Sequence, residues 1–385
     1  MPIQPQTTEW TWEADTRTLR VYGPNVDTFL ATYKDLYSVQ HLDLSRTDVS
    51  HNSMSVLSQL TSLETLDMGV TNVADISKLS GLKSLKTLNL YGTNVSDISE
   101  ISCLVSLETL DLSRTNVADI SKLSGLMSLE NLSLSWTKVT DISALSGLKS
   151  LEWLSLSDTK VSDISKLSGL ESLVTLNLSR TNVADISKLS GLESLETLHL
   201  TGTNVADISK LSGLMSLESL YLSFTKVTDI FALSDLNSLK SLHLQKTCVK
   251  DISPLSNRKL EVLNLIDTPV TDFSALHDVQ ILSLTDPGLA KETELILTGN
   301  QKIYKYTEES SEHLAACKDA EMSQKSTRTD KKPEEAILMP TGQGDTTHVD
   351  KKPISGAAIA LICVSVALVV GGGLCFLYFK QAAVV

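Results

Sequence analysis

Ten aspartates occupy one position of a repeated motif, and their spacing could carry chemistry. The first nine are spaced 22 residues apart and the tenth follows after 21: Asp75, Asp97, Asp119, Asp141, Asp163, Asp185, Asp207, Asp229, Asp251 and Asp272. In stacked units, neighbours in such a column would lie roughly 5 Å apart. Closely spaced carboxylates bind calcium or share acid–base work as a pair. A carboxylate ladder is therefore one hypothesis for this column, which we call the cap column.

A structural role explains the cap column more simply. Each aspartate precedes a segment such as ISKLSGL, which is typical of a single helical turn. Aspartate at an N-cap contributes about 1 kcal/mol, and the glycine suits a left-handed C′ position. Calcium-binding solenoids also need glycine-rich loops with further carboxylates, and the repeats carry none. We therefore predict that these aspartates are structural caps and bind no metal.

A leucine pattern with the same period defines the elements that hold the cap column. Leucines recur every 22 residues at Leu63, Leu85, Leu107, Leu129, Leu151, Leu173, Leu195, Leu217 and Leu239. The unit reads LxxLxLxxTxVxDISxLSGLxS, and looser copies begin at Val39, Leu260 and Val279, which gives about twelve units. This period with LxxLxL is typical of a leucine-rich repeat solenoid.

The chemistry of one unit explains the pattern. Leu110 and Leu112 alternate with polar residues, which predicts a short strand with both leucines facing the core. Thr115 stands where this class of repeat often has asparagine, and we expect its side chain to bond backbone groups and turn the chain. Val117 and Ile120 then return apolar groups to the core. Since no unit buries that face alone, units must stack with their strands in parallel.

The repeat unit resembles the short leucine-rich repeats of bacterial internalins and of regulatory subunits of protein phosphatase-1. Its serine-rich motif, TxVxDISxLSxL, is also similar to the repeats of leucine-rich repeat proteins of kinetoplastid parasites. The resemblance covers about residues 39–286. It implies an α/β horseshoe with parallel strands on the concave face, short helical turns on the convex face, and protein ligands bound in the concavity.

The letters that change between units predict the interaction surface. They stand at strand positions and just after the strands, where the alternation directs side chains away from the core. Aromatic and arginine side chains dominate the energetics of protein interfaces. We predict a partner-binding site on the concave face at Arg114, Trp136, Trp153, Asp158, Arg180, Tyr221 and Phe224. The alternative is unselected surface variation between drifting repeats.

A block of four units is duplicated within the chain. Residues 107–128 match residues 195–216 at 19 of 22 positions, and in the following units Trp136 aligns with Phe224. The core and turn residues are shared between the copies, whereas the residues on the strand side differ. This contrast favours a functional role for the strand side.

Other functional classes lack support in the sequence. The net charge of −13 argues against nucleic-acid binding. The chain has no GxSxG elbow, no glycine-rich phosphate loop and no CxxC pair. His199 and His243 lie two units apart, roughly 10 Å, which is too far to share a metal. We predict a non-enzymatic protein with no cofactor, metal or nucleic-acid partner.

Segments outside the repeats predict caps, a stalk and a membrane anchor. Polar turns flanked by alternating residues predict hairpins at residues 9–23 and 294–306. A polar stretch with DKKP twice predicts a disordered stalk, and 26 residues without charge predict a transmembrane helix. The expected divisions are an N-terminal cap (1–38), the repeats (39–286), a C-terminal cap (287–306), the stalk (307–353), the transmembrane helix (354–379) and a short tail (380–385).

The orientation in the membrane stays open. The N-terminus, MPIQPQTTEWTWEAD, has no basic or long apolar stretch, so we expect no signal peptide. Lys351 and Lys352 precede the span and Lys380 follows it, which favours cytosolic repeats. Leucine-rich ectodomains on stalks favour the cell surface. The first hypothesis is a membrane-anchored recognition or adhesion module that binds protein on its concave face. The alternative is a cytosolic, tail-anchored regulatory scaffold like a phosphatase subunit.

Overall fold

The N-terminal hairpin opens the fold. The computed structural model describes residues 8–256, 258–276, 279–284 and 302–305, all of them within one compact unit, Met1–Lys331. Strand β1 (Glu9–Glu13) pairs antiparallel with β2 (Thr18–Tyr22), which is the hairpin that the alternation predicts. On its other side β2 pairs in parallel with β3 (His41–Asp43). The hairpin therefore covers the first edge of the parallel sheet.

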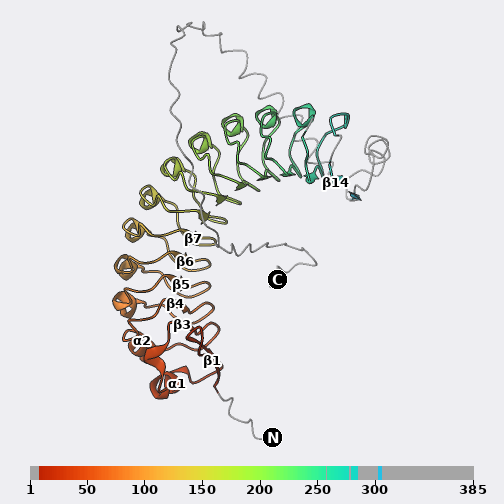
Figure 1. Ribbon diagram of the computed structural model, residues 1–385. Helices are drawn as coiled ribbons and strands as arrows, with labels where there is room; N and C mark the ends of the chain where they lie inside the picture. Colours follow the sequence, from red (N-terminus) through yellow and green to blue (C-terminus); the bar gives the residue numbers. More distant parts are fainter. Residues whose placement is uncertain (1–7, 257, 277–278, 285–301, 306–385) are drawn as a thin grey trace, which may run out of the picture. The chain divides into compact units, whose positions relative to one another are not determined.

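One sheet of fifteen strands runs through the described unit in chain order. After β3 come β4 (Thr65–Asp67), β5 (Thr87–Asn89), β6 (Thr109–Asp111), β7 (Asn131–Ser133), β8 (Trp153–Ser155), β9 (Thr175–Asn177), β10 (Thr197–His199), β11 (Ser219–Tyr221), β12 (Ser241–His243), β13 (Val262–Asn264), β14 (Ile281–Leu284) and β15 (Lys302–Lys305). Strands β3 to β14 correspond to the twelve units expected, and each pairs in parallel with the next. In Figure 1 the strands line the inner side of the curved stack.

Short 3-10 helices lie between the strands in the chain: η1 precedes β3, and η2 to η10 follow the strands β4 to β12 on the outer side of the stack. They are η1 (Leu36–Ser38), η2 (Ser77–Gly81), η3 (Ser99–Cys103), η4 (Ser121–Leu123), η5 (Ser143–Leu145), η6 (Ser165–Leu167), η7 (Ser187–Leu189), η8 (Ser209–Leu211), η9 (Phe231–Leu233) and η10 (Ser253–Leu255). Two longer α-helices, α1 (Val26–Thr32) and α2 (His51–Leu57), lie near the N-terminus. The repeat pattern predicted neither of them: α1 precedes the first repeat at Val39, and the unit with α2 lacks the DISxL motif and is 24 residues long between Val39 and Leu63.

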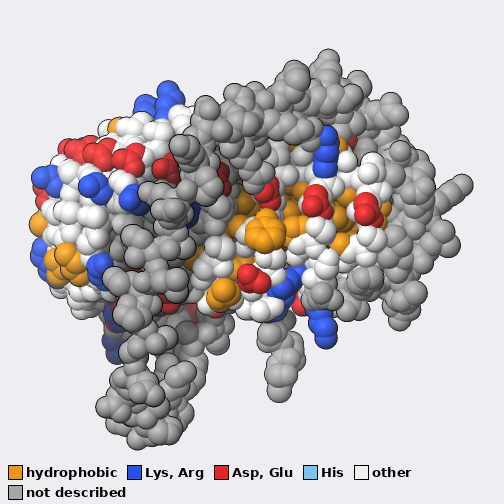
Figure 2. Space-filling model, turned by 90° about the horizontal axis from the view of Figure 1, so that it is seen from above, with side chains coloured by type: hydrophobic (Ala, Val, Ile, Leu, Met, Phe, Trp, Pro, Cys, Tyr) orange, Lys and Arg blue, Asp and Glu red, His pale blue; other side chains and the backbone are white. Residues whose placement is uncertain are grey.

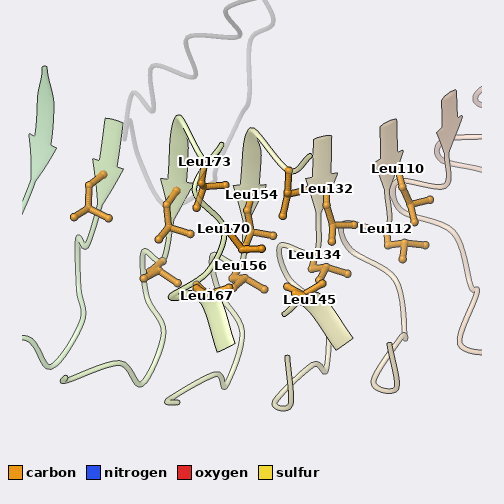
Figure 3. Packing of buried hydrophobic residues seen from close by; sticks show 14 of the residues in the cluster. Leu110, Leu112, Leu132, Leu134, Leu145, Leu154, Leu156, Leu167, Leu170 and Leu173 are labelled. Carbon is orange, nitrogen blue, oxygen red and sulfur yellow. The ribbon is translucent and has the colours of Figure 1, made fainter. Parts of the chain in front are cut away.

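A ladder of leucines forms the core. Leu110, Leu132 and Leu154 stand directly opposite one another in neighbouring strands and are almost fully buried. Figure 3 shows these leucines in one row and the second strand leucines, such as Leu112 and Leu134, in a row beside them. Burying one leucine side chain contributes about 1.5–3 kcal/mol. The repeated leucines therefore hold every strand in the same register.

Several predicted segments fall outside the described residues. Among the residues that the structure describes, no helix is long and apolar enough to cross a bilayer. The transmembrane helix predicted at 354–379, the stalk at 307–353 and the tail at 380–385 are not among them. Of the predicted C-terminal hairpin only β15 is described, and it extends the sheet in parallel with β14.

Candidate functional site

The turn after each strand builds the candidate site. At the end of β6 the Asp111 carboxylate accepts a hydrogen bond of 2.8 Å from the Ser113 N–H. The Thr115 hydroxyl donates to the Leu112 carbonyl at 2.6 Å, and the equivalent threonines of other units do the same. The role predicted for this threonine is therefore confirmed. These local bonds bend the chain sharply where the strand ends.

The turn places one residue of each unit in the left-handed backbone region. These residues, which we call the left-handed column, are Arg46, Val70, Gly92, Arg114, Trp136, Asp158, Arg180, Gly202, Phe224, Lys246 and Asp267, with φ from 52° to 71°. Most backbone N–H groups of the column donate to a carbonyl of the next unit, as Trp136 does to Ser157 at 2.9 Å. A left-handed conformation costs a residue other than glycine roughly 1–2 kcal/mol. Only two of the eleven members are glycine, so the other nine retain their side chains despite the cost in backbone strain.

Val70 gives a direct measure of this strain. It is β-branched, half-exposed and left-handed, with φ 57°. We expect Val70→Gly to be more stable than Val70→Ala by about 0.5–1 kcal/mol, because only glycine relieves the steric cost. Urea unfolding of the two variants measures the difference. If the alanine variant is equally stable, the strain assigned to the left-handed column is wrong.

Four of the predicted site residues form one cluster around Trp136. The Arg114 guanidinium lies 5.3 Å from the centroid of the Trp136 ring, and that of Arg180 lies 5.8 Å from it. Arg114 also lies 5.9 Å from the ring of Tyr91. Asp158 accepts two hydrogen bonds from Arg180, at 2.5 and 2.7 Å, and this raises the pKa of the guanidinium. Each cation–π contact contributes about 0.5–1 kcal/mol at an exposed site.

Phe224 lies in a second cluster, separate from the first. The Lys246 ammonium is 5.4 Å from the centroid of the Phe224 ring. The same ammonium lies 3.8 Å from an Asp267 carboxylate oxygen. This arrangement of an aromatic ring, a cation and a carboxylate repeats that of Trp136, and the sequence did not predict the contacts.

Tyr221 belongs to a stack of three rings on the strand side. The rings of His199 and Tyr221 have centroids 4.2 Å apart at 9°, and those of Tyr221 and His243 are 4.5 Å apart at 15°. Burial lowers the pKa of His199 to about 4, and it also lowers the pKa of His243. The sequence spacing of His199 and His243 argued only against a shared metal site and did not predict the stack. Their shared strand position in consecutive units was the signal for the stack.

Trp153 stands apart from these groups. It is the first residue of β8, is about one-third exposed, and lies in the ladder between Asn131 and Thr175. It makes no ring contact with any other residue that the structure describes. The seven predicted site residues therefore lie in three groups along the strand side, plus Trp153 alone.

The aspartates of the cap column stabilise the starts of the 3-10 helices, but they lie one position before the N-cap where they were predicted. The Asp119 carboxylate accepts a hydrogen bond of 2.8 Å from the Ser121 N–H, and the equivalent bond occurs at all ten aspartates. The residue at the N-cap is Ile120, so the aspartate lies one position earlier. The bond to this N–H lowers the pKa of Asp119. Within the described ranges no cluster of three acidic, histidine or cysteine side chains is suited to a metal ion.

The prediction of left-handed glycines after the helical turns was wrong. Gly125 and its equivalents do not have positive φ. The helix ends on Ser124 in the right-handed region, and the Leu126 N–H bonds back to Leu123 at 3.0 Å. The chain therefore continues its right-handed turn, and left-handed geometry occurs after the strand instead.

Comparison with known proteins agrees with this geometry. A family profile described as "Leucine Rich repeats (2 copies)" matches residues 61–103, 83–125, 149–193, 171–213, 193–238 and 216–257. The chain is a leucine-rich repeat protein. An internalin of Listeria monocytogenes resembles this leucine-rich repeat protein with 25% identity and a TM-score of 0.64, over 75% of this chain and 90% of the internalin.

Two further solved structures are similar to this leucine-rich repeat protein. Internalin C2 of Listeria monocytogenes is 30% identical over 54% of this chain and 83% of its own, with a TM-score of 0.47. The plant peptide hormone receptor RGFR1, in complex with RGF2, is 16% identical over 78% of this chain and 51% of its own, with a TM-score of 0.53. Curated protein sequences gave no match. The leucine-rich repeat fold is typical of non-enzymatic protein-binding modules.

Proposed function

We propose that the strand side is a protein-binding face and that the protein is a non-enzymatic recognition module. The left-handed column carries the proposal. Trp136 and Phe224 are 46% and 50% exposed, and both are held in a strained backbone conformation that glycine would adopt freely. Large aromatic side chains at such positions contribute nothing to the core, whereas they are effective anchors for a partner. The peptide-bound plant receptor of the same fold supports this role.

We propose further that residues 354–379 anchor the protein in a membrane, with residues 307–353 as the tether. The uncharged run of 26 residues supports the anchor. The alternative is a cytosolic regulatory scaffold on an organelle membrane. Protease digestion of intact cells distinguishes the two orientations, and so does a glycosidase shift at the sequons of Asn94, Asn131 and Asn177.

The binding face is tested by removing two tryptophans. We expect Trp136→Ala with Trp153→Ala to reduce capture of the partner by at least tenfold, because exposed aromatic anchors contribute about 2 kcal/mol or more each. Capture is measured by quantitative mass spectrometry of proteins retained on the immobilised full chain.

Phe231→Ala is the matched control. Phe231 is exposed on η9, on the opposite side of the stack, so its removal should leave capture unchanged. Equal retention by the double variant and the wild-type chain would refute the binding face.

A further inference from the structure

The two ends of the strands carry opposite charge. At the residue before each strand the described units have mostly glutamate: Glu64, Glu108, Glu130, Glu152, Glu196, Glu218 and Glu261, with lysine at Lys86 and Lys240. Both lysines are neutralised there, by Glu64 at 2.8 Å and by Glu218 at 2.6 Å. Burial raises the pKa of Glu130, and the neighbouring carboxylates of Glu152 and Glu108 raise it further. The start of the strands is therefore an acidic edge.

The opposite end of the strands is basic. The left-handed column and the position two residues after each of its members carry six cations in the central units: Arg114, Lys138, Lys160, Arg180, Lys226 and Lys246. We call these six, with Trp136 and Phe224, the basic rim. Figure 2 shows apolar side chains gathered on the described surface beside basic and acidic ones.

The carboxylates of the basic rim are covered. Asp158 lies under Arg180 and Asp267 under Lys246, and each aspartate side chain is only 9% exposed. At these two ion pairs the solvent therefore contacts the cation more than the carboxylate. Lys138, Lys160 and Lys226 have no ion-pair partner among the residues that the structure describes.

The basic rim contains the same device twice. Trp136 and Phe224 occupy equivalent places in the duplicated blocks, and each is stacked by a cation that pairs with an aspartate. The order of charges is reversed between the copies, Asp158 before Arg180 but Lys246 before Asp267. The ion pair and the exposed ring are thus common to both copies even though the residues differ.

We infer that the basic rim binds an acidic, extended segment of a protein partner at two points, Trp136 and Phe224. This inference rests on the proposed function and names its ligand. Four units separate the two rings, about 19 Å at the spacing of strands. An extended segment rises about 3.3 Å per residue, so its two apolar side chains would lie about six residues apart, with acidic residues between them.

A single extended chain fits the rim better than a wide polyanion does. Six residues separate Glu108 on the acidic edge from Arg114 on the rim, about 20 Å of extended backbone at most. A ligand as broad as a nucleic-acid duplex would meet both edges and be repelled by the glutamates. A narrow peptide contacts the cations alone.

A labelled peptide tests the inference. The probe is a fluorescein-labelled twelve-residue peptide of glutamate and serine with two leucines six positions apart, and its partner probe has lysine for glutamate. Fluorescence anisotropy with the full chain should show binding of the glutamate peptide only. Lys138→Glu with Lys226→Glu should weaken binding of the glutamate peptide at least tenfold. Trp136→Ala with Phe224→Ala should also weaken it at least tenfold, both at low and at high salt.

Matched variants and competitors decide the outcome. Lys122→Glu with Lys188→Glu changes the net charge equally on η4 and η7, on the outer side, and should alter the affinity less than twofold. Equal weakening by this control, equal binding of the lysine peptide, or tighter binding of an oligonucleotide of the same charge would each overturn the inference. Trp153→Ala keeps the two proposals apart, because it removes a strand residue outside the rim. If Trp153→Ala abolishes capture of the partner while the rim variants leave binding of the glutamate peptide unchanged, the inference is refuted and the proposed binding face stands.

Discussion

Leu154→Ala is expected to lower the free energy of unfolding of the central repeats by about 3–4 kcal/mol. Leu154 is fully buried in β8 and stands in the ladder between Leu132 and Leu176. Truncation removes three carbons that both neighbours contact. The parallel backbone ladder fixes those neighbours, so the cavity cannot close by collapse and the cost should lie in the upper part of the usual range.

The position of the damage is as informative as its size. In a solenoid each unit contacts only its neighbours, so stability is a sum of local terms. Hydrogen exchange should therefore accelerate most in β7, β8 and β9, while the N-terminal hairpin keeps its protection. Urea unfolding gives the total change, and hydrogen exchange with mass spectrometry locates it.

Glu152→Ala provides the control for Leu154→Ala. Glu152 is exposed and immediately precedes β8, so its removal should cost less than about 0.5 kcal/mol. Uniform loss of protection across all strands after Leu154→Ala would contradict the additive description and indicate one cooperative unit.

The repeating elements were predictable because each unit has the same pattern of apolar and polar residues. Leu110, Leu112 and Thr115 have equivalents in every central unit, so a strand, its register and the turn after it follow from periodicity alone. Neighbouring units differ little in length, which leaves only parallel stacking to bury the leucines. The unit with α2 breaks the pattern, and there the longer helix was not predicted.

The backbone details depend on contacts between units, which the pattern of one unit does not contain. The Arg114 N–H donates to Ser135 in the next unit, and this bond helps to hold the left-handed turn. The sequence placed that geometry at Gly125, where glycine is common. It also placed the cap one residue too early, at Asp119 rather than Ile120, because a 3-10 helix begins later than a full α-helical turn would.

Side-chain clusters in the candidate site were predicted only in part. The alternation placed Arg114, Trp136 and Arg180 on the same side of the sheet, and the structure brings these three together. The stack of Tyr221 with its two histidines depends on ring orientations across three units, which spacing alone does not specify. The binding role of these residues stays a prediction.

Acidification from pH 7 to pH 4.5 is expected to destabilise the units around β10 by about 2–3 kcal/mol. Burial within the stack holds the pKa of His199 at about 4, whereas an unfolded chain titrates near the usual value of 6.5. The lowered pKa of His243 acts in the same direction. Below pH 6.5 the unfolded state therefore binds more protons than the folded state, so stability present at neutral pH is lost as the pH falls towards 4.

The aspartates of the described units affect the pH dependence of stability differently from the histidines. The lowered pKa of Asp119 and most of the cap column gives stability that is lost only as the pH falls through and below about 3.8. The raised pKa values of Asp67 and Asp111, caused by burial, act in the opposite direction, because the folded state takes up their protons first. The aspartates are common to the wild-type chain and a His199 variant, so the difference between their pH dependences from pH 7 to pH 4.5 isolates the histidine.

His199→Gln is the decisive variant for this pH dependence. It removes the titrating ring and also some stacking with Tyr221, so its stability at pH 7 should fall by about 0.5–1.5 kcal/mol. The quantity to compare is the change in urea midpoint between pH 7 and pH 4.5, which should shrink to less than half that of the wild-type chain. His51→Gln, at an exposed position on α2, should leave this change intact. If His199→Gln retains the full pH dependence, the buried imidazole does not control it, and protonation elsewhere in the chain must account for the loss.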